Sequence, residues 1–271
     1  MKQFLIVLTF SFLCIPASPQ TNSAWYGKKC AVVLTYDDAI DQHLDNAIPV
    51  LDSAGLKATF YITGFSASMQ ARLNDWKKIA GRDHELGNHT LYHPCTGSLP
   101  DRQWVNAETD MDKYTVKRME NEIRMTNLFL QALDGKTKRT FAYTCGDRLI
   151  GDSSFLSGMK NDFIAARGVS RQMNKISGIG LTNVNCYPVS GESGAQMIEW
   201  VQKAMETNSL LVFLFHGVGG GHSLNVSNEA HRELILFLKQ HEKEIMIAPM
   251  YEVAVHIKDW QNREATRKRG R

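Results

Sequence analysis

The chain of 271 residues is 43% hydrophobic and 22% charged, so it can bury a full core as one large domain or two small ones. Its formal net charge of +3 is too small to indicate a nucleic-acid partner. Much of the positive excess lies in Arg267–Arg271, which is typical of a solvated chain end rather than of a binding surface.

Residues 1–20 have the character of a secretory signal peptide. A lysine near the start precedes the apolar stretch Phe4–Ile15, and small, turn-prone residues follow it. The apolar stretch is too short to span a bilayer. Cys14 raises the alternative of a lipoprotein, which the two large residues before it disfavour. We therefore expect residues 21–271 to form a mature protein that is secreted or periplasmic and has no stable membrane span.

Short apolar runs alternate with longer amphipathic stretches along the mature chain. The runs predict β-strands at 31–35, 58–62, 140–143, 163–166, 183–187, 210–215 and 245–248. Helical periodicity predicts helices at 40–53, 69–80, 116–133, 194–207 and 228–241. Strand and helix in alternation imply parallel strands joined by crossover helices, and six or seven such units are enough to close a barrel. No linker interrupts the series, so we predict one α/β domain.

Four cysteines remain after the signal segment, an even number that suits an exported protein. Three disulfide pairings are open, and separate buried thiols are an equal alternative, because the spacing fits no thiolate metal motif. The four are Cys30, Cys95, Cys145 and Cys186.

An acidic pair and two histidines predict a metal centre. Asp37 and Asp38 end the first apolar run, and His89 and His93 come later in the chain. Histidines at i and i+4 lie on one face of a helical turn, so both can reach one divalent ion, and a carboxylate can complete an open site. Taken alone, the acidic pair is more typical of a helix cap and the histidine spacing is a weak signal. Together, after predicted strands, they favour a hydrolytic metal centre.

Further polar residues follow two other predicted strands. Cys145 comes soon after one of them, and His216 directly follows another. In parallel α/β folds the chemistry gathers at the carboxyl ends of the strands, so these residues should meet the acidic pair and the histidines. Gly217–Gly221 lacks the lysine of a phosphate-binding loop and predicts a flexible loop over the site.

Other histidines and aromatic residues lack such support. Five histidines are predicted at the surface: His84, His222, His231, His241 and His256. Among the aromatic residues only Tyr92, between the two motif histidines, has a position that favours the cleft, whereas core is the more common place for Trp76, Trp104 and Tyr187.

The ordered motifs resemble a known family. They are Thr35-Tyr36-Asp37-Asp38, His89-Thr90-Leu91-Tyr92-His93, Phe141-Ala142-Tyr143-Thr144-Cys145-Gly146 and Leu214-Phe215-His216. This set resembles the polysaccharide deacetylases with a NodB-homology domain, carbohydrate esterases that remove acetyl groups from sugars. The likeness spans roughly residues 28 to 258, nearly all of the mature chain. It implies a distorted (β/α) barrel with about seven parallel strands.

The resemblance also implies roles for individual residues. Asp37 corresponds to the general base and His216 to the general acid that protonates the leaving group. The family's ligands for zinc, or for a similar divalent ion such as Co²⁺ or Ni²⁺, correspond to Asp38, His89 and His93. The substrate implied is N- or O-acetylated carbohydrate. The family places an oxyanion-binding backbone amide at the position of Cys145.

Two features depart from the family pattern. The arginine that orients the base is missing before the tyrosine of the third motif, and Arg139 or Arg167 could replace it from a neighbouring strand. Arg167 is favoured because it ends a predicted strand. The acidic partner of the late histidine has no counterpart near Asn183–Pro188. These gaps leave two alternatives to a secreted deacetylase: a degenerate member that binds glycan without turning it over, or a hydrolase of another non-peptide C–N bond, which the export signal disfavours.

Overall fold

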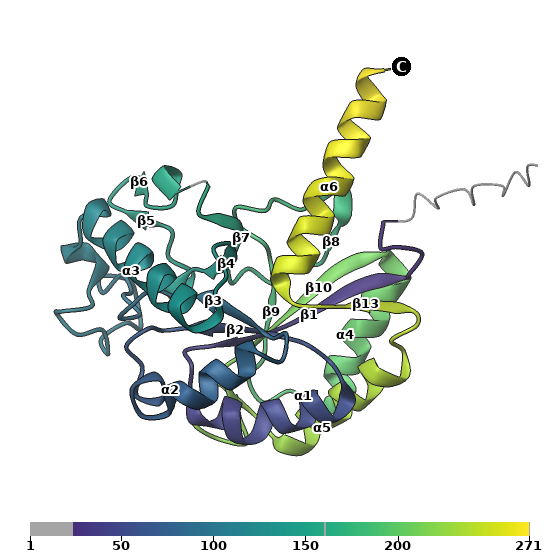
Figure 1. Ribbon diagram of the computed structural model, residues 1–271, viewed down its shortest axis with the longest axis horizontal. Helices are drawn as coiled ribbons and strands as arrows, with labels where there is room; N and C mark the ends of the chain where they lie inside the picture. The colour runs from purple at the N-terminus through teal and green to yellow at the C-terminus, as the bar shows by residue number, and fades with distance from the viewer. Residues whose placement is uncertain (1–23, 160, 271) are drawn as a thin grey trace, which may run out of the picture.

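The computed structural model describes residues 24–159 and 161–270 (Figure 1). The predicted signal segment, residues 1–20 with Cys14, lies outside the described residues. Among those described, no helix combines the length and apolar character that crossing a bilayer requires.

One curled sheet of nine strands forms the centre of the fold. Six strands run parallel and side by side in the order β7 (Phe163–Arg167), β4 (Arg139–Ala142), β3 (Glu85–Asn88), β2 (Thr59–Ile62), β1 (Cys30–Asp37) and β10 (Ser209–Phe215). The short β8 (Asn174–Lys175) is antiparallel to β10, and β13 (Ile245–Ile247) is parallel to the first half of β1.

A seventh parallel strand brings the two ends of this row together. Strand β9 (Tyr187–Pro188) pairs with β10, and just before it Val184 pairs with Arg167 at the end of β7. The chain over residues 184–188 therefore joins β7 to β10, and the seven strands form the predicted distorted α/β barrel. A regular strand was expected over residues 183–187. The chain there forms only the bridge at Val184 and the two-residue β9, because its two ends pair with different strands, β7 and β10.

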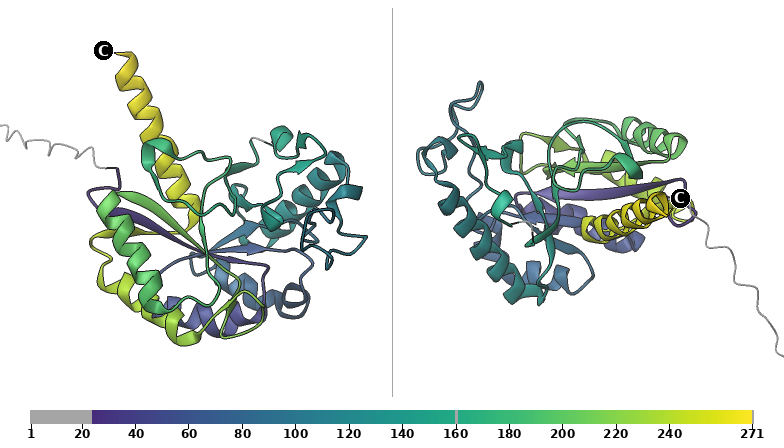
Figure 2. Two further views of the ribbon diagram at one scale, coloured as in Figure 1. Left: turned by 180° about the vertical axis from the view of Figure 1, so that it is seen from behind. Right: turned by 90° about the horizontal axis from the view of Figure 1, so that it is seen from above.

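In the described part of the chain, six α-helices surround the sheet (Figures 1 and 2). They are α1 (Ile48–Ala54), α2 (Ala67–Ala80), α3 (Val116–Asp134), α4 (Gly194–Thr207), α5 (Asn228–Gln240) and α6 (Met250–Arg269). Side-chain oxygens cap the amino ends of α2 to α5 by accepting backbone N–H bonds, and the capping residues are Ser66, Thr115, Ser193 and Ser227. Four of the five predicted helices are thereby confirmed with small changes at their ends.

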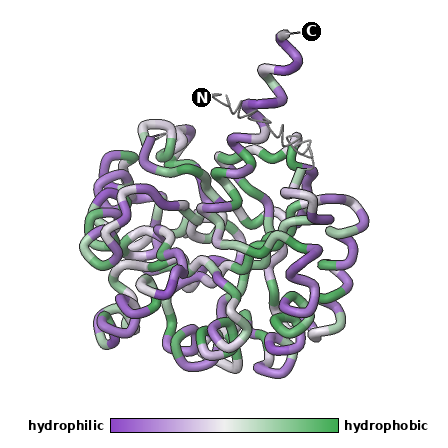
Figure 3. The backbone as a smooth tube through the Cα atoms, turned by 45° about the vertical axis from the view of Figure 1, so that its right-hand side comes forward, coloured by the Kyte–Doolittle hydropathy of each residue, from purple (hydrophilic) through white to green (hydrophobic). Residues whose placement is uncertain are grey.

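Two helical segments differ from the prediction. The helix expected at 40–53 is present over residues 41–54, but His43–Ala47 form a π-helical turn within it, just before α1. Helix α6 was not predicted, because apolar residues mark only its first half, and the second half is mostly polar and projects from the body (Figure 3). Short elements complete the chain: β5 (Leu149–Ile150), β6 (Ser153–Ser154), β11 (Gly217–Val218), β12 (Asn225–Val226) and 3₁₀ turns at Met111–Lys113, Thr144–Gly146, Ser157–Met159 and Ile176–Gly178.

Alternating side chains of β1 face two separate apolar layers. Val32, Leu34 and Tyr36 pack with residues of α1, α2, α4 and α5, whereas Ala31 and Val33 pack with α6 and the segment after β8. This two-residue period is that of an extended strand with both faces buried. Strand β1 thus lies rigidly within the core, and its carboxyl end is a fixed platform for the acidic pair.

Candidate active site and metal centre

The acidic pair lies where β1 ends. Asp37 is the last residue of the strand, and Asp38 leaves it with a left-handed backbone, φ 81°. Because of this turn both carboxylates approach the same imidazole: Oδ2 of Asp37 lies 3.8 Å and Oδ1 of Asp38 lies 3.5 Å from Nε2 of His89. The two neighbouring carboxylates therefore do not point to opposite faces, because the strand has already ended at Asp38.

The two histidines follow β3 in a loop and not in a helical turn, which corrects the prediction. Thr90 and His93 both have left-handed backbones, φ 63° and 54°. The side chain of Asn88 accepts a hydrogen bond from the Thr90 N–H, and the Thr90 hydroxyl accepts one from the His93 N–H. These local side-chain bonds take the place of helical ones. They still bring the two imidazole rings together, with centroids 4.9 Å apart.

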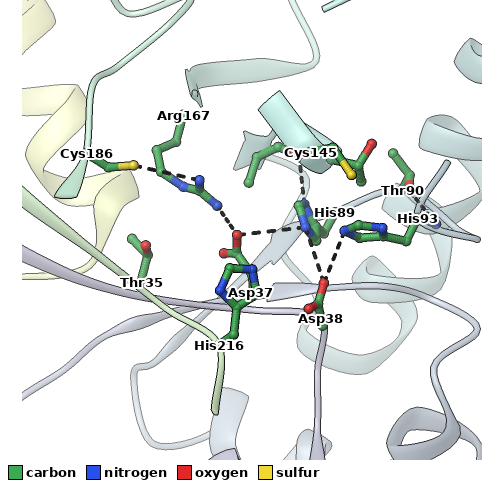
Figure 4. Close-up of polar contacts among 12 residues, drawn as sticks. Thr35, Asp37, Asp38, His89, Thr90, His93, Cys145, Arg167, Cys186 and His216 are labelled. Atoms are coloured by element: carbon green, nitrogen blue, oxygen red, sulfur yellow. Dashed lines mark hydrogen bonds and ion pairs between the residues drawn. The ribbon is translucent and has the colours of Figure 1, made fainter. Parts of the chain in front are cut away.

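Asp38, His89 and His93 converge as a set of metal ligands (Figure 4). Oδ1 of Asp38 lies 3.3 Å from Nε2 of His93, and one ligand atom from each of the three residues lies within 4.8 Å of the others. This buried Asp38 oxygen has no hydrogen-bond partner among the described residues. Nδ1 of His89 donates to the Ala142 carbonyl at 2.9 Å, which leaves Nε2 as the atom with a free lone pair. One carboxylate and two imidazoles fit a divalent cation such as zinc.

The protonation states of Asp38 and His89 suit them to bind a metal ion. Burial alone would raise the pKa of Asp38, but His93 and then His89 lower it to about 2, so this carboxylate is charged at neutral pH. Burial lowers the pKa of His89 to about 4, so its ring is neutral. A charged carboxylate and a neutral imidazole are the forms that bind a cation.

Asp37 is held by an arginine instead. Nη2 of Arg167, at the end of β7, forms a buried ion pair with Oδ2 of Asp37 (Figure 4). Burial would lower the pKa of Arg167, but the Asp37 carboxylate raises it above its ordinary value. Oδ1 of Asp37 is buried without a hydrogen-bond partner among the described residues. The structure therefore fixes one oxygen of Asp37 and leaves the other free for a small molecule in the cavity.

His216 follows β10 and faces the acidic pair (Figure 4). Burial lowers its pKa, against the opposing effect of Asp37 and Asp38. Its Nδ1 is buried with no hydrogen-bond partner in the described chain, and no carboxylate takes the place of the missing acidic residue. The ring of His222, from the glycine-rich loop, stacks on it at a centroid distance of 4.6 Å.

Several histidines were predicted wrongly as surface residues. His84, His231 and His256 are buried and bonded, and His222 lines the site. Their partners are distant in the chain, so no local pattern marks them. His222 could have been noticed only because it directly follows Gly217–Gly221, the loop predicted to cover the site.

Cys145 connects the loops after β3 and β4. It forms a disulfide with Cys95, two residues beyond His93, while Cys30 and Cys186 remain buried thiols. Cys145 lies in the turn Thr144–Gly146 with a left-handed backbone, φ 56°. The disulfide therefore joins the metal-ligand loop covalently to the segment where the oxyanion-binding amide is expected.

The site residues line a cavity of about 260 Å³. Trp104, which was interpreted as core, is 62% exposed and lines this cavity, whereas Trp76 is buried in the core. Tyr92 is 43% exposed but is not a cavity-lining residue, so the preference for it was misplaced. The loop that carries Trp104 is anchored by Arg102, which donates to both carboxylate oxygens of Asp147.

A larger cavity of about 480 Å³ lies where β3 and β4 begin, at the other end of the strands. Glu85, its buried carboxylate, accepts hydrogen bonds from the side chains of Thr59 and Thr140 and from the N–H groups of Thr140 and Tyr251. A carboxylate with both oxygens bonded is structural, so the chemistry belongs to the smaller cavity.

Comparison with known proteins gives one family. The sequence profile described as polysaccharide deacetylase matches residues 26–157. A peptidoglycan-N-acetylglucosamine deacetylase of Bacillus cereus is 33% identical over 79 residues, or 29% of this chain. An uncharacterized protein, YlxY, of Bacillus subtilis is 29% identical over 106 residues, or 39% of this chain. Each match spans 28% of the relative's own length.

Solved structures share the fold. The peptidoglycan deacetylase PdaC from Bacillus subtilis aligns with a TM-score of 0.51 at 15% identity, over 88% of this chain and 96% of the other. A CE4 family pseudoenzyme from Bacillus anthracis aligns with a TM-score of 0.52 at 15% identity, over 84% of this chain and 66% of the other. At such identities the likeness concerns the fold alone.

Proposed function

Because this chain belongs to the polysaccharide deacetylase family, we propose that it is a divalent-metal-dependent hydrolase that removes acetyl groups from N- or O-acetylated carbohydrate. The observation that carries the proposal is the convergence of Asp38, His89 and His93 beside an Asp37 that Arg167 holds. A divalent cation such as Zn²⁺, Co²⁺ or Ni²⁺, held by these three ligands, would polarise the acetyl carbonyl and lower the pKa of its water.

Asp37 acts as the general base in this proposal. Arg167 fixes one of its oxygens, and the other is buried with no partner in the described structure, so it can accept the proton of the attacking water. The same ion pair occupies Oδ2 of Asp37, the oxygen that lies 3.8 Å from Nε2 of His89. Arg167 is therefore a positioning residue, and the two neighbouring carboxylates have separate tasks.

The acetyl group itself needs two further contacts. The backbone N–H of Cys145 is proposed to donate to the oxyanion that forms when water adds to the carbonyl carbon. His216, across the cavity from the disulfide loop, is proposed to protonate the departing amine or alkoxide. Burial lowers the pKa of His216, and the carboxylates of Asp37 and Asp38 oppose this effect and favour the protonated imidazole that the step requires.

The place of action is proposed to be outside the cytoplasm, with residues 1–20 as the export signal. Structural disulfides persist mainly in oxidising compartments, and the pair Cys95–Cys145 lies at the site itself. Acetylated cell-envelope or plant-wall glycans are the substrates that such a location offers.

One observation favours a second function, glycan binding without turnover. Nδ1 of His216 has no hydrogen-bond partner among the described residues, so nothing fixes the tautomer of the proposed acid. A pseudoenzyme is also among the structural relatives. If the imidazole of His216 cannot protonate the leaving group, the protein would bind the acetylated glycan without releasing acetate.

Metal analysis followed by an acetate-release screen separates the two functions. The purified mature protein should contain about one divalent ion per chain and release acetate from chitin oligomers, peptidoglycan or acetylated xylan. Asp37→Asn should keep the metal and lose acetate release, whereas Asp38→Asn should lose both. Metal and glycan binding without acetate from any of these substrates would favour the binding protein. A wild-type protein that binds no divalent ion would overturn both proposed functions.

A further inference from the structure

A second group of metal-binding side chains adjoins the proposed centre and shares one residue with it. His93, Cys95 and Cys145 bring one nitrogen and two sulfur atoms within 4.8 Å of one another. The two sulfurs form the disulfide, and Sγ of Cys95 lies 3.6 Å from Nδ1 of His93. Two cysteines and a histidine are a common set of protein ligands for zinc, but only when the sulfurs are reduced to thiolates.

The ring of His93 faces both groups. Its Nε2 lies 3.3 Å from Asp38, and its Nδ1 faces Cys95. A neutral imidazole has a lone pair on one nitrogen and a proton on the other. It can bind a cation through Nε2 in the centre with Asp38 and His89, or through Nδ1 in a centre with the two sulfurs. The two uses of the neutral ring are mutually exclusive.

We propose that reduction of the Cys95–Cys145 disulfide creates a Cys₂His metal site that withdraws His93 from the Asp38–His89 centre. The S–S bond breaks, each sulfur gains an electron and a proton, and two molecules of a small thiol are oxidised to their disulfide. Binding of the cation then releases both thiol protons. Thiolates are softer ligands than carboxylates and select zinc-like ions, so the new site competes for the same metal.

The backbone geometry permits such a site. The Cα atoms of the two cysteines are 5.9 Å apart. Two thiolates on one tetrahedral zinc lie roughly 3.7 Å from each other, because each Zn–S bond is about 2.3 Å. The sulfurs must therefore separate when the bond breaks, and each can do so by rotating about its own Cα–Cβ bond. The cavity beside Cys145 gives room for this movement.

The consequence for activity rests on the proposed function. In an oxidising compartment the disulfide removes the competing ligands and leaves Nε2 of His93 for the centre. In a reducing cytoplasm the thiolates hold the metal and the centre lacks one ligand, so the protein would be inactive before export. The metal chemistry can be tested without any measurement of activity.

Cobalt substitution provides that test. The oxidised protein and protein reduced with a phosphine, which is then removed, are each titrated with Co²⁺ under anaerobic conditions. We expect a near-ultraviolet sulfur-to-cobalt charge-transfer absorption in the reduced protein only. Both forms should bind about one cobalt ion per chain, because His93 serves one centre at a time.

Matched variants locate the signal. Cys30→Ala, which removes a buried thiol elsewhere, should keep the absorption, whereas Cys95→Ser/Cys145→Ser should abolish it. If the double variant does not fold, alkylation of the reduced wild-type protein with iodoacetamide serves the same purpose. Absence of the absorption after reduction, or its survival after alkylation, would overturn the proposal. So would two cobalt ions per reduced chain, because His93 would then not be shared. Failure to release acetate bears only on the proposed function.

Discussion

Replacement of Arg167 by methionine tests whether the buried ion pair organises the site. The side chains of Arg167 and Asp37 are 0% and 4% exposed, so the methionine would leave the Asp37 carboxylate buried opposite an uncharged group. Removing one partner of a buried ion pair typically costs about 3–5 kcal/mol, mostly because the remaining charge loses its compensation. We expect the free energy of unfolding, measured in urea, to fall by that amount. Acetate release should fall by roughly 10²-fold, because the base loses its anchor.

A double-mutant cycle isolates the pair from other effects of the substitution. Asp37→Asn removes the charge that Arg167 compensates, so Arg167→Met should cost much less in that background. We expect a coupling energy of at least about 2 kcal/mol between the two positions. If the two single effects add to within ~0.5 kcal/mol in the double variant, the ion pair does not organise the site and the reasoning fails.

A second buried ion pair provides the control for stability. Arg139 and Asp134 are 2% and 1% exposed, and Arg139 also donates to the Leu86 carbonyl at the start of β3, far from the acidic pair. Arg139→Met should lower the free energy of unfolding to a similar degree while acetate release from the folded protein persists. A matching loss of release in this variant would mean that Arg167→Met acts only through stability.

Three other predictions follow from burial and connectivity. Burial lowers the pKa of His43 to about 4 and of His231 to about 3, so both stay neutral in the fold while the unfolded chain takes up protons below about pH 6.5. The free energy of unfolding should therefore fall as the pH drops from 6.5 towards 4, by up to ~1.4 kcal/mol per pH unit for each histidine, and His231→Gln should make the pH profile measured in urea less steep. Reduction of the disulfide, which closes a loop with a sequence separation of 50, should lower the free energy of unfolding by up to about 4 kcal/mol, and an unchanged urea midpoint would contradict this. Trp104→Ala should raise KM for an oligosaccharide several-fold with kcat almost unchanged, because the exposed ring offers a stacking surface; a selective loss of kcat would point to another role.

The fold could be predicted wherever local patterns agree with tertiary packing. The helices α3, α4 and α5 each combine a helical apolar period with a side-chain cap, so their positions follow from nearby residues. Helix α6 has no side-chain cap at its start, and its second half has no regular apolar period because most of its residues are polar. Its first half is held by long-range packing that a sequence pattern does not reveal.

The residues that meet at the candidate site could be predicted, but their geometry could not. The expectation that Arg167 replaces the missing arginine rests on its place at a strand end, and the structure brings it to Asp37 because β7 and β1 lie on opposite sides of the curled sheet. The disulfide could not be chosen from three pairings, because only the approach of the loops after β3 and β4 decides it. The helical spacing of His89 and His93 correctly predicted that the two rings are neighbours, although the backbone between them is a loop and not a helix.

That backbone explains why the site depends on its surroundings. Left-handed non-glycine residues gather here: Asp38, Ala39, Thr90, His93 and Cys145. Each such residue costs on the order of 1–3 kcal/mol and persists only when neighbouring contacts hold it. The disulfide and the Arg102–Asp147 pair join the two loops that carry three of the five residues, while the Arg167–Asp37 pair holds the end of β1. Loss of the Arg102–Asp147 pair should therefore release strained backbone at the ligands, so an Arg102-substituted protein with its disulfide intact would lose metal affinity before it unfolds.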